Sequence, residues 1–219
     1  MPKNKPITIS FLNKAFEGLD PRPIGQYNYS SVLIPLIEKD GELHILYEVR
    51  AETLRSQPGE ISFPGGKMEE GEIPLECAIR ETSEEIGIPM DTIDIITELN
   101  YINSYSNFTM YSFLGQIAPE VIDNAKINEA EVKEIFTVPL QFFVDNDPYI
   151  YTYDLRPDVK DDFPYREYGI EENYPWRKGT ATVPFYTYRS RVIWGLTARL
   201  TLDLSRMIRE KLTPQYSVL

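Results

Sequence analysis

The chain has 219 residues, of which 42% are hydrophobic and 26% are charged, an ordinary composition for a folded domain with a sizeable core. Its formal net charge of −12 argues against general binding to nucleic acid, which needs a basic surface. The single cysteine excludes an intramolecular disulfide and fits a reducing compartment. The first residues are polar and do not resemble a signal peptide, and no segment approaches the roughly 18 apolar residues needed to span a membrane. We therefore expect a cytoplasmic protein.

The pattern of apolar residues and of chain breakers predicts a series of strands interrupted by one central helix. Asp40-Gly41 is typical of a tight turn between two strands of a hairpin. Strands on both sides of a central helix, with another helix near the end, indicate a mixed sheet between helices, so the predicted fold class is α/β. In chain order we expect a helix over 7–19, strands over 31–37, 43–49 and 61–63, a helix over 74–86, strands over 93–99, 110–117 and 132–138, a helical turn over 140–144, a strand over 180–188 and a helix over 194–211.

Two segments stand outside this pattern, and we interpret the chain as a single domain over 1–219 that includes them. Residues 1–30 are expected to form an N-terminal extension. Residues 145–177 are rich in Tyr, Asp and Pro and show no sustained period, so we expect a long loop or insertion, which in a compact domain is often functional. The tyrosines over 149–174 either pack against the domain or shape a pocket.

Residues 64–88 hold the densest group of chemically active side chains. Pro74 suits the first position of a helix, and Gly87 suits a left-handed C-cap. At about 100° per residue, one face of this helix is apolar and the opposite face is acidic. The face expected to be buried carries Leu75, Ile79, Thr82 and Ile86. The opposite face carries Glu81, Glu84 and Glu85.

These three glutamates have two interpretations. Glutamates clustered on a helix commonly form a solvated acidic face. They also suit a hard-cation site, because carboxylate oxygens are the ligands that Mg²⁺ and Mn²⁺ prefer, with waters and substrate phosphates completing the shell. Arg80 is one turn from Glu84 and can orient carboxylates.

The spacing decides between the two interpretations. Seven positions stand at characteristic intervals, followed by an apolar residue: Gly66, Glu72, Arg80, Glu81, Glu84, Glu85 and Gly87. This arrangement resembles the Nudix box, with Thr82 where an aliphatic residue is usual. The resemblance implies a Nudix-type α/β/α sandwich with a mixed sheet and a C-terminal helix. It also implies that Glu81, Glu84 and Glu85 bind Mg²⁺ or Mn²⁺.

A second group of residues lies upstream of the box and comprises Arg50, Ala51, Arg55, Gly59 and residues 63–66. Their spacing is similar to the signature of the coenzyme A pyrophosphatase branch of the Nudix family, which begins Leu-Leu-Thr-x-Arg-(Ser or Ala). Tyr47 and Glu48 depart from it where the family tends to have Leu and Thr. The resemblance covers roughly residues 30–210.

The chemistry of this upstream group is compatible with a phosphate-bearing substrate. Arg50 and Arg55 can contact phosphate with forked geometry. Glycines allow the backbone to approach a ligand closely, so we expect substrate contacts at Gly59, Gly65 and Gly66.

The resemblance implies metal-dependent hydrolysis of the diphosphate bond of coenzyme A or an acyl derivative, giving 3′,5′-ADP and (acyl-)4′-phosphopantetheine. The bound ions would neutralise the diphosphate and lower the pKa of the attacking water. Glu81 and Glu131 are the candidates to accept the proton of that water. Glu72 is expected to support the loop and to hold Arg80. Arg80 is the third expected catalytic residue, beside Glu81 and Glu131.

Two alternatives stay open. The substrate could be ADP-ribose, a dinucleoside polyphosphate or a noncanonical nucleotide. The chain could also be a non-catalytic Nudix sensor, although such a domain would be expected to lose box carboxylates that are intact here. The expected partner is a small-molecule substrate and neither nucleic acid nor a membrane, and a homodimer is compatible with these features.

Overall fold

The computed structural model describes residues 7–19, 24–25 and 28–212. Near the N-terminus, the helix predicted over 7–19 is present as the shorter α1 (Ile9–Ala15), and the side chain of Thr8 accepts a hydrogen bond from the backbone N–H of Phe11 at 3.2 Å. None of the residues of α1 is buried, so its apolar face does not join the core. The predicted extension also overlaps the fold, because Asn28 already belongs to the first strand.

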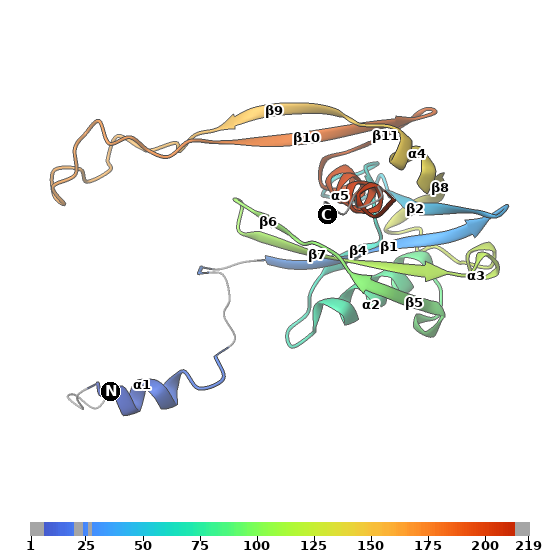
Figure 1. The fold of residues 1–219 in the computed structure, drawn as a ribbon, viewed down its shortest axis with the longest axis horizontal. Helices are drawn as coiled ribbons and strands as arrows, with labels where there is room; N and C mark the ends of the chain where they lie inside the picture. The colour runs from blue at the N-terminus through green and yellow to red at the C-terminus, as the bar shows by residue number, and fades with distance from the viewer. Residues whose placement is uncertain (1–6, 20–23, 26–27, 213–219) are drawn as a thin grey trace, which may run out of the picture.

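An eight-stranded mixed sheet forms the centre of the molecule (Figure 1). Its central strand, β1 (Asn28–Lys39), runs parallel to β7 (Phe108–Ile117) and antiparallel to β2 (Glu42–Arg50). Residues 31–37 of β1 are all buried, as expected for a strand covered on both faces. The other strands are β3 (Ile61–Ser62), β4 (Gly65–Lys67), β5 (Ile93–Glu98), β6 (Ile102–Ser104) and β8 (Val132–Pro139).

The hairpin predicted at Asp40-Gly41 is confirmed, because β1 and β2 pair antiparallel on either side of it. Both turn residues are left-handed, with φ of 53° at Asp40 and 79° at Gly41, as a two-residue turn of the primed type requires. On the opposite side of β2, β8 pairs with it, and the register shifts between Val49 and Arg50. Such an irregularity bends the end of a strand, here at the residue expected to contact substrate.

Helices cover both faces of the sheet, which confirms the predicted α/β/α sandwich with a C-terminal helix (Figure 1). The helix α2 (Pro74–Ile86) packs on a core cluster that includes Leu33 and Leu46, while α5 (Gly195–Leu212) packs on one that includes Ile34. Neighbouring residues of one strand serve opposite cores because their side chains alternate. Shorter helices are η1 (Met90–Thr92), α3 (Pro119–Asp123) and α4 (Leu140–Asp145).

A second, three-stranded sheet lies beyond α5 and corrects the first part of the long loop or insertion predicted over 145–177 (Figure 1). It consists of β9 (Tyr149–Leu155), β10 (Gly179–Tyr188) and β11 (Arg191–Trp194). The first part of the expected loop is therefore a strand, paired antiparallel with β10 in a long hairpin. Strand β9 is mostly exposed and is built from aromatic and polar residues, so it lacks the aliphatic alternation that indicates a strand. Within the described ranges, no helix has the length and apolar character needed to cross a membrane.

Candidate active site

The helix α2 begins and ends where the sequence predicts. Pro74 is its first residue, and the side chain of Glu76 accepts a hydrogen bond from the backbone N–H of Ile73 at 3.4 Å. Gly87 adopts the left-handed conformation with φ of 73°, and its N–H donates to the carbonyl of Ser83. These ends fix which way each side chain of the helix points.

One box glutamate is more deeply buried than the helical pattern predicts. Glu85 was expected on the acidic face turned away from the core, but it is only 4% exposed. The backbone N–H of Gly65 donates to its Oε2 at 2.8 Å. The expected burial is confirmed for Thr82 and Ile86, so the buried face is wider than the apolar pattern indicates.

Two glycines of β4 explain this close packing. A Cβ on Gly65 would overlap the backbone of Ser31 and Val32, and a Cβ on Gly66 would overlap the carboxylate of Glu81. Because neither residue has a side chain, the helix approaches the strand closely. The glycine turn therefore brings the backbone N–H of Gly65 into contact with the carboxylate of Glu85 and leaves room for the carboxylate of Glu81.

The guanidinium of Arg80 donates hydrogen bonds to three carboxylates. Its Nε and Nη2 donate to the two oxygens of Glu72 at 2.8 and 3.0 Å, a forked pair that lowers the pKa of Glu72 to about 2. Its Nη1 donates to Glu81 at 2.9 Å and to Glu84 at 3.2 Å. Glu72 thus supports Arg80, as expected from the sequence, and Arg80 holds two of the box glutamates.

Glu48 is a site residue whose role sequence reasoning missed. Its side chain on β2 is fully buried, and Ser62 Oγ donates to its Oε1 at 2.9 Å. Its Oε2 has no hydrogen-bond partner among the described residues. Burial raises the pKa of Glu48 to about 7, and the charges of Glu131 and Glu81 act in the same direction. Alternation along β2 could have revealed this position, since Glu48 shares a face with Leu46, which packs toward α2.

The same electrostatic neighbourhood includes Glu85 and Glu131. Burial and the charge of Glu48 raise the pKa of Glu85 to about 9. The backbone of the loop that carries Glu131 is tied to both sides of the site: Ala51 N–H donates to the carbonyl of Glu131 at 2.8 Å, and Asn128 N–H donates to the carbonyl of Glu85 at 2.9 Å. Burial also raises the pKa of Glu81. Four glutamates therefore lie close enough for their charges to interact.

A divalent cation fits the chemistry of these donors. Among residues 7–19, 24–25 and 28–212, no three acidic, His or Cys side chains already converge in ligating geometry. Glu81 and Glu84 are engaged by Arg80, and Glu85 by Gly65. Oxygen donors of this kind suit Mg²⁺ or Mn²⁺, and a cation would neutralise buried carboxylates that otherwise repel one another.

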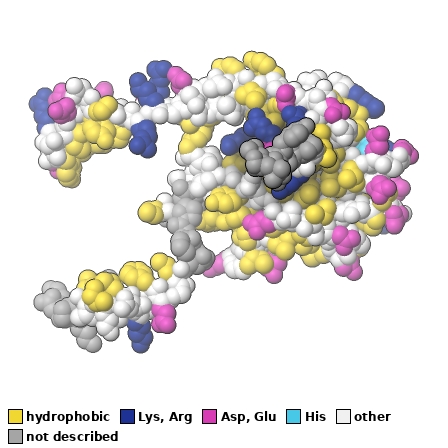
Figure 2. Space-filling model, in the orientation of Figure 1, with side chains coloured by type: hydrophobic (Ala, Val, Ile, Leu, Met, Phe, Trp, Pro, Cys, Tyr) yellow, Lys and Arg dark blue, Asp and Glu magenta, His cyan; other side chains and the backbone are white. Residues whose placement is uncertain are grey.

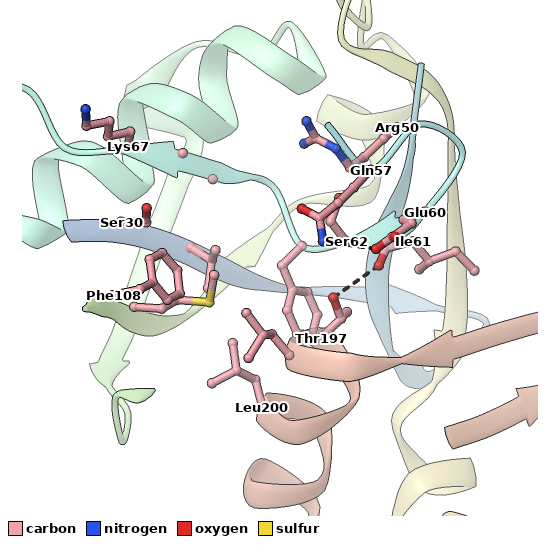
Figure 3. Close-up of a pocket in the computed structure, with 16 residues that line it drawn as sticks. Ser30, Arg50, Gln57, Glu60, Ile61, Ser62, Lys67, Phe108, Thr197 and Leu200 are labelled. Atoms are coloured by element: carbon pink, nitrogen blue, oxygen red, sulfur yellow. Dashed lines mark hydrogen bonds between the residues drawn. The ribbon is translucent and has the colours of Figure 1, made fainter. Parts of the chain in front are cut away.

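A cavity of about 240 Å³ opens beside the glycine turn (Figure 3). Arg50 from the end of β2 and Lys67 from β4 lie on different sides of it, and α5 contributes Thr197 and Leu200. The Nε of Arg50 is buried and has no hydrogen-bond partner among the described residues. The rest of the lining includes both polar and apolar groups, among them Ser30, Phe63, Gly65, Gly66, Met110 and Leu196.

Other residues expected to contact substrate lie outside this lining. Arg55 is exposed on the loop between β2 and β3. Gly59, with φ of 70°, donates its N–H to the carbonyl of Arg50 at 3.1 Å and so shapes the loop that returns to that arginine. The tyrosines over 149–174 are likewise absent from the lining that the described residues form. Roles for Arg55 and Gly59 in binding stay predictions.

Comparison with known proteins gives the family. The sequence model of the NUDIX domain matches residues 28–152, from the first strand of the central sheet to within β9. The chain belongs to the Nudix family. Members of this family hydrolyse nucleoside diphosphate derivatives, and the box glutamates described above occupy the family's characteristic spacing.

Three curated Nudix proteins illustrate the similarity. Nudix hydrolase 3 of Caenorhabditis elegans is 41% identical over 112 residues, which are 50% of this chain and 47% of that protein, so the match spans about half of that relative's length. The uncharacterised Nudix hydrolase NudL of Photorhabdus laumondii is 29% identical over 204 residues, 91% of this chain and 96% of that protein. The peroxisomal coenzyme A diphosphatase NUDT7 of Mus musculus is 27% identical over 197 residues, 87% and 74% respectively.

Proposed function

We propose that this Nudix protein is a coenzyme A diphosphatase. It would hydrolyse the diphosphate bond of coenzyme A or acyl-coenzyme A, giving 3′,5′-ADP and (acyl-)4′-phosphopantetheine. The observation that carries the proposal is the cavity in which Arg50 meets the glycine turn next to the box glutamates. Arg50 belongs to the upstream signature of the coenzyme A branch, and its buried Nε has no hydrogen-bond partner in the described structure. A phosphate oxygen would supply that partner.

The arrangement also suits a substrate with a long, partly apolar body. The cavity is bordered on different sides by Arg50 and Lys67, which can attract phosphate, and its lining also includes apolar side chains such as Met110 and Leu200. Its volume holds only part of coenzyme A, so the remainder would extend outward from the mouth of the cavity. Similarity to the mouse coenzyme A diphosphatase supports the same substrate class.

In this proposal each box residue has a separate task. When bound, Mg²⁺ or Mn²⁺ would neutralise the diphosphate and favour the ionisation of a nucleophilic water. Glu81, Glu84 and Glu85 would hold the cation, and Arg80 would keep Glu81 and Glu84 oriented toward it. Glu81 and Glu131 are the candidates to accept the proton of the attacking water.

The departure of Tyr47 from the branch signature does not weaken the substrate assignment. Its ring is buried on the α5 side of the sheet, stacked on Phe63, and its hydroxyl is 3.0 Å from Oγ1 of Thr201. Tyr47 is therefore a core residue and does not line the cavity. A different diphosphate, such as ADP-ribose or a dinucleoside polyphosphate, is the alternative substrate.

The single cysteine of the chain bears on the compartment in which the enzyme would act. Cys77, the single cysteine, is buried and free, and burial raises the pKa of its thiol to about 12. A thiol in this state is unreactive. With one cysteine the chain forms no intramolecular disulfide, which fits a reducing compartment, so we include a cytoplasmic location in the proposal. A homodimer also stays a prediction.

The test compares two arginines of the upstream signature. Coenzyme A is incubated with the protein and Mg²⁺ or Mn²⁺, and 3′,5′-ADP is quantified by chromatography for wild type, Arg50→Gln and Arg55→Gln. The proposal predicts release of 3′,5′-ADP by wild type and a loss of about tenfold or more in kcat/KM for Arg50→Gln. Arg55→Gln, at an exposed site, is the matched control for loss of one charge and is expected to lose less. If wild type released no 3′,5′-ADP but cleaved another nucleotide, the substrate assignment would be wrong.

A further inference from the structure

Glu48 has a buried carboxyl group that the described residues only partly satisfy. Its side chain is 0% exposed, and only Oε1 receives a hydrogen bond, from Ser62. Oε2 is buried and has no hydrogen-bond partner among the described residues. A buried carboxylate is costly unless it is paired or binds a cation.

The groups around Glu48 add to this cost. The charges of Glu81 and Glu131 act on Glu48, and Glu48 in turn acts on Glu85, so the neighbourhood is mainly acidic. Arg50 is the positive group that acts on Glu48, but no ion pair between them occurs in the part of the chain that the structure describes. A further positive charge within this group of carboxylates would satisfy the open oxygen.

We infer that Glu48 is a ligand of the divalent-cation site, contributing Oε2 beside the carboxylates of Glu81 and Glu85. The inference rests on the metal-dependent part of the proposed function, and not on the identity of the substrate. Glu48 lies on β2, 24 residues before Glu72, so its carboxylate is additional to those that the box supplies. Mg²⁺ or Mn²⁺ is the expected ligand class, because all the donors are hard oxygens.

Strand geometry explains how a residue outside the box reaches the site. Glu48 and Ser62 are cross-strand partners on β2 and β3, and the hydrogen bond between their side chains holds Oε1 and leaves Oε2 available. The α2 side of β2 also carries Leu46, so Glu48 projects toward the helix that bears Glu81 and Glu85. The metal site would thus be shared between the helix and the sheet.

The test measures metal binding without substrate. Mn²⁺ and Mg²⁺ are titrated by calorimetry into full-length wild type and Glu48→Gln, and thermal unfolding is followed with and without each ion. Glu48→Gln keeps the size of the side chain and its hydrogen bond to Ser62 but removes the charge. We expect the Kd for Mn²⁺ to weaken by about tenfold or more and the metal-induced rise in Tm to shrink. The metal-free variant should have a Tm equal to or above that of wild type, because repulsion is relieved.

Two further variants keep the result interpretable. Ser62→Ala leaves the carboxylate of Glu48 in place and is expected to bind Mn²⁺ within about threefold of wild type. Glu48→Asp keeps the charge but shortens its reach, and it serves if Glu48→Gln does not fold. Wild-type Mn²⁺ affinity in Glu48→Gln, or in Glu48→Asp when that variant is used, would overturn the inference. Because no nucleotide is present, this result is independent of whether coenzyme A is the substrate.

Discussion

The backbone N–H of Gly65 and the carboxylate of Glu85 are joined by a hydrogen bond of 2.8 Å. Gly65 belongs to the upstream signature, and Glu85 belongs to the acidic helix 20 residues further along the chain. This bond ties the turn that borders the substrate cavity to the helix that would hold the cation. A substitution in the turn should therefore disturb the helix, and a substitution in the helix should disturb the turn.

Substitution of Gly66 should separate activity from stability. In Gly66→Ala, the new Cβ would overlap the carboxylate of Glu81, which can move away because it is the end of a flexible side chain. We expect kcat to fall by about 100-fold, on the scale of a displaced catalytic group, with little change in the free energy of unfolding. Steady-state kinetics and urea unfolding measure the two effects.

Gly65→Ala is the matched comparison, because its Cβ would meet backbone atoms of Ser31 and Val32 and its φ is 149°. These atoms cannot move without disturbing β1, so this variant should lose about 3 kcal/mol of stability or fail to fold. Equal stability of the two variants would contradict the packing described for β4 and α2.

Arg80→Lys should impair turnover although it conserves charge. Lysine cannot reproduce the forked pair with Glu72 while also reaching Glu81 and Glu84, so the box carboxylates lose their common support. We expect a fall in kcat of about tenfold to 100-fold and weaker Mn²⁺ binding. In Glu72→Gln, which keeps the arginine, the loss should be smaller. Unchanged kinetics in Arg80→Lys would show that the orientation of these carboxylates does not depend on the forked pair between Arg80 and Glu72.

Local rules predicted the framework of this fold well. Pro74 and Gly87 delimit α2, and Asp40-Gly41 marks the hairpin, because the backbone conformations at these positions depend on the residues themselves. The burial of Glu85 could not be predicted in this way. Helical periodicity places it opposite the apolar face, and it is buried because β4, a strand distant from it in the sequence, packs against that side of the helix and Gly65 contacts it.

Glu48 and β9 escaped prediction for related reasons. The signature that the upstream residues resemble tends to have Thr at position 48, so the resemblance marks Glu48 as a departure and says nothing of its contact with Ser62. Strand β9 has few buried residues, and its pairing with β10 spans a loop of more than 20 residues. The position of Glu48 in the site and the formation of β9 both depend on contacts between distant segments, which a local sequence pattern does not reveal.

Tyr47→Phe tests whether the other departure from the signature is structural. The hydroxyl of Tyr47 is 3.0 Å from Oγ1 of Thr201, which also donates to the carbonyl of Thr197. Removing one buried hydroxyl should cost about 1 kcal/mol of stability and leave kcat/KM for coenzyme A unchanged. Urea unfolding and kinetics provide the check. A change in substrate preference would mean that Tyr47 influences the cavity.

The stability of the metal-free protein should fall as pH rises. Burial raises the pKa of Glu48 to about 7 and that of Glu85 to about 9, above the ordinary value of a glutamate in the unfolded chain. Between pH 5.5 and 8.5 the folded state therefore binds more protons than the unfolded state, so the free energy of unfolding decreases with pH.

Urea unfolding in EDTA across this range measures the slope, which has a limit of about 1.4 kcal/mol per pH unit for each group. Glu85→Gln should flatten the slope, and saturating Mn²⁺ should reduce it, because the cation stabilises the ionised carboxylates. A metal-free stability that rises with pH over the same range would show that these glutamates are not buried together as described.

The central claim, that this Nudix protein cleaves the diphosphate of coenzyme A, is tested most directly by comparing substrates. Wild-type protein with Mg²⁺ or Mn²⁺ is assayed on coenzyme A, acetyl-coenzyme A, ADP-ribose, NADH and diadenosine polyphosphates, and kcat/KM is determined for each. We expect coenzyme A or its acetyl derivative to have the highest value, with 3′,5′-ADP as a product. A higher kcat/KM for another member of the panel, or tight nucleotide binding without cleavage, would contradict the claim.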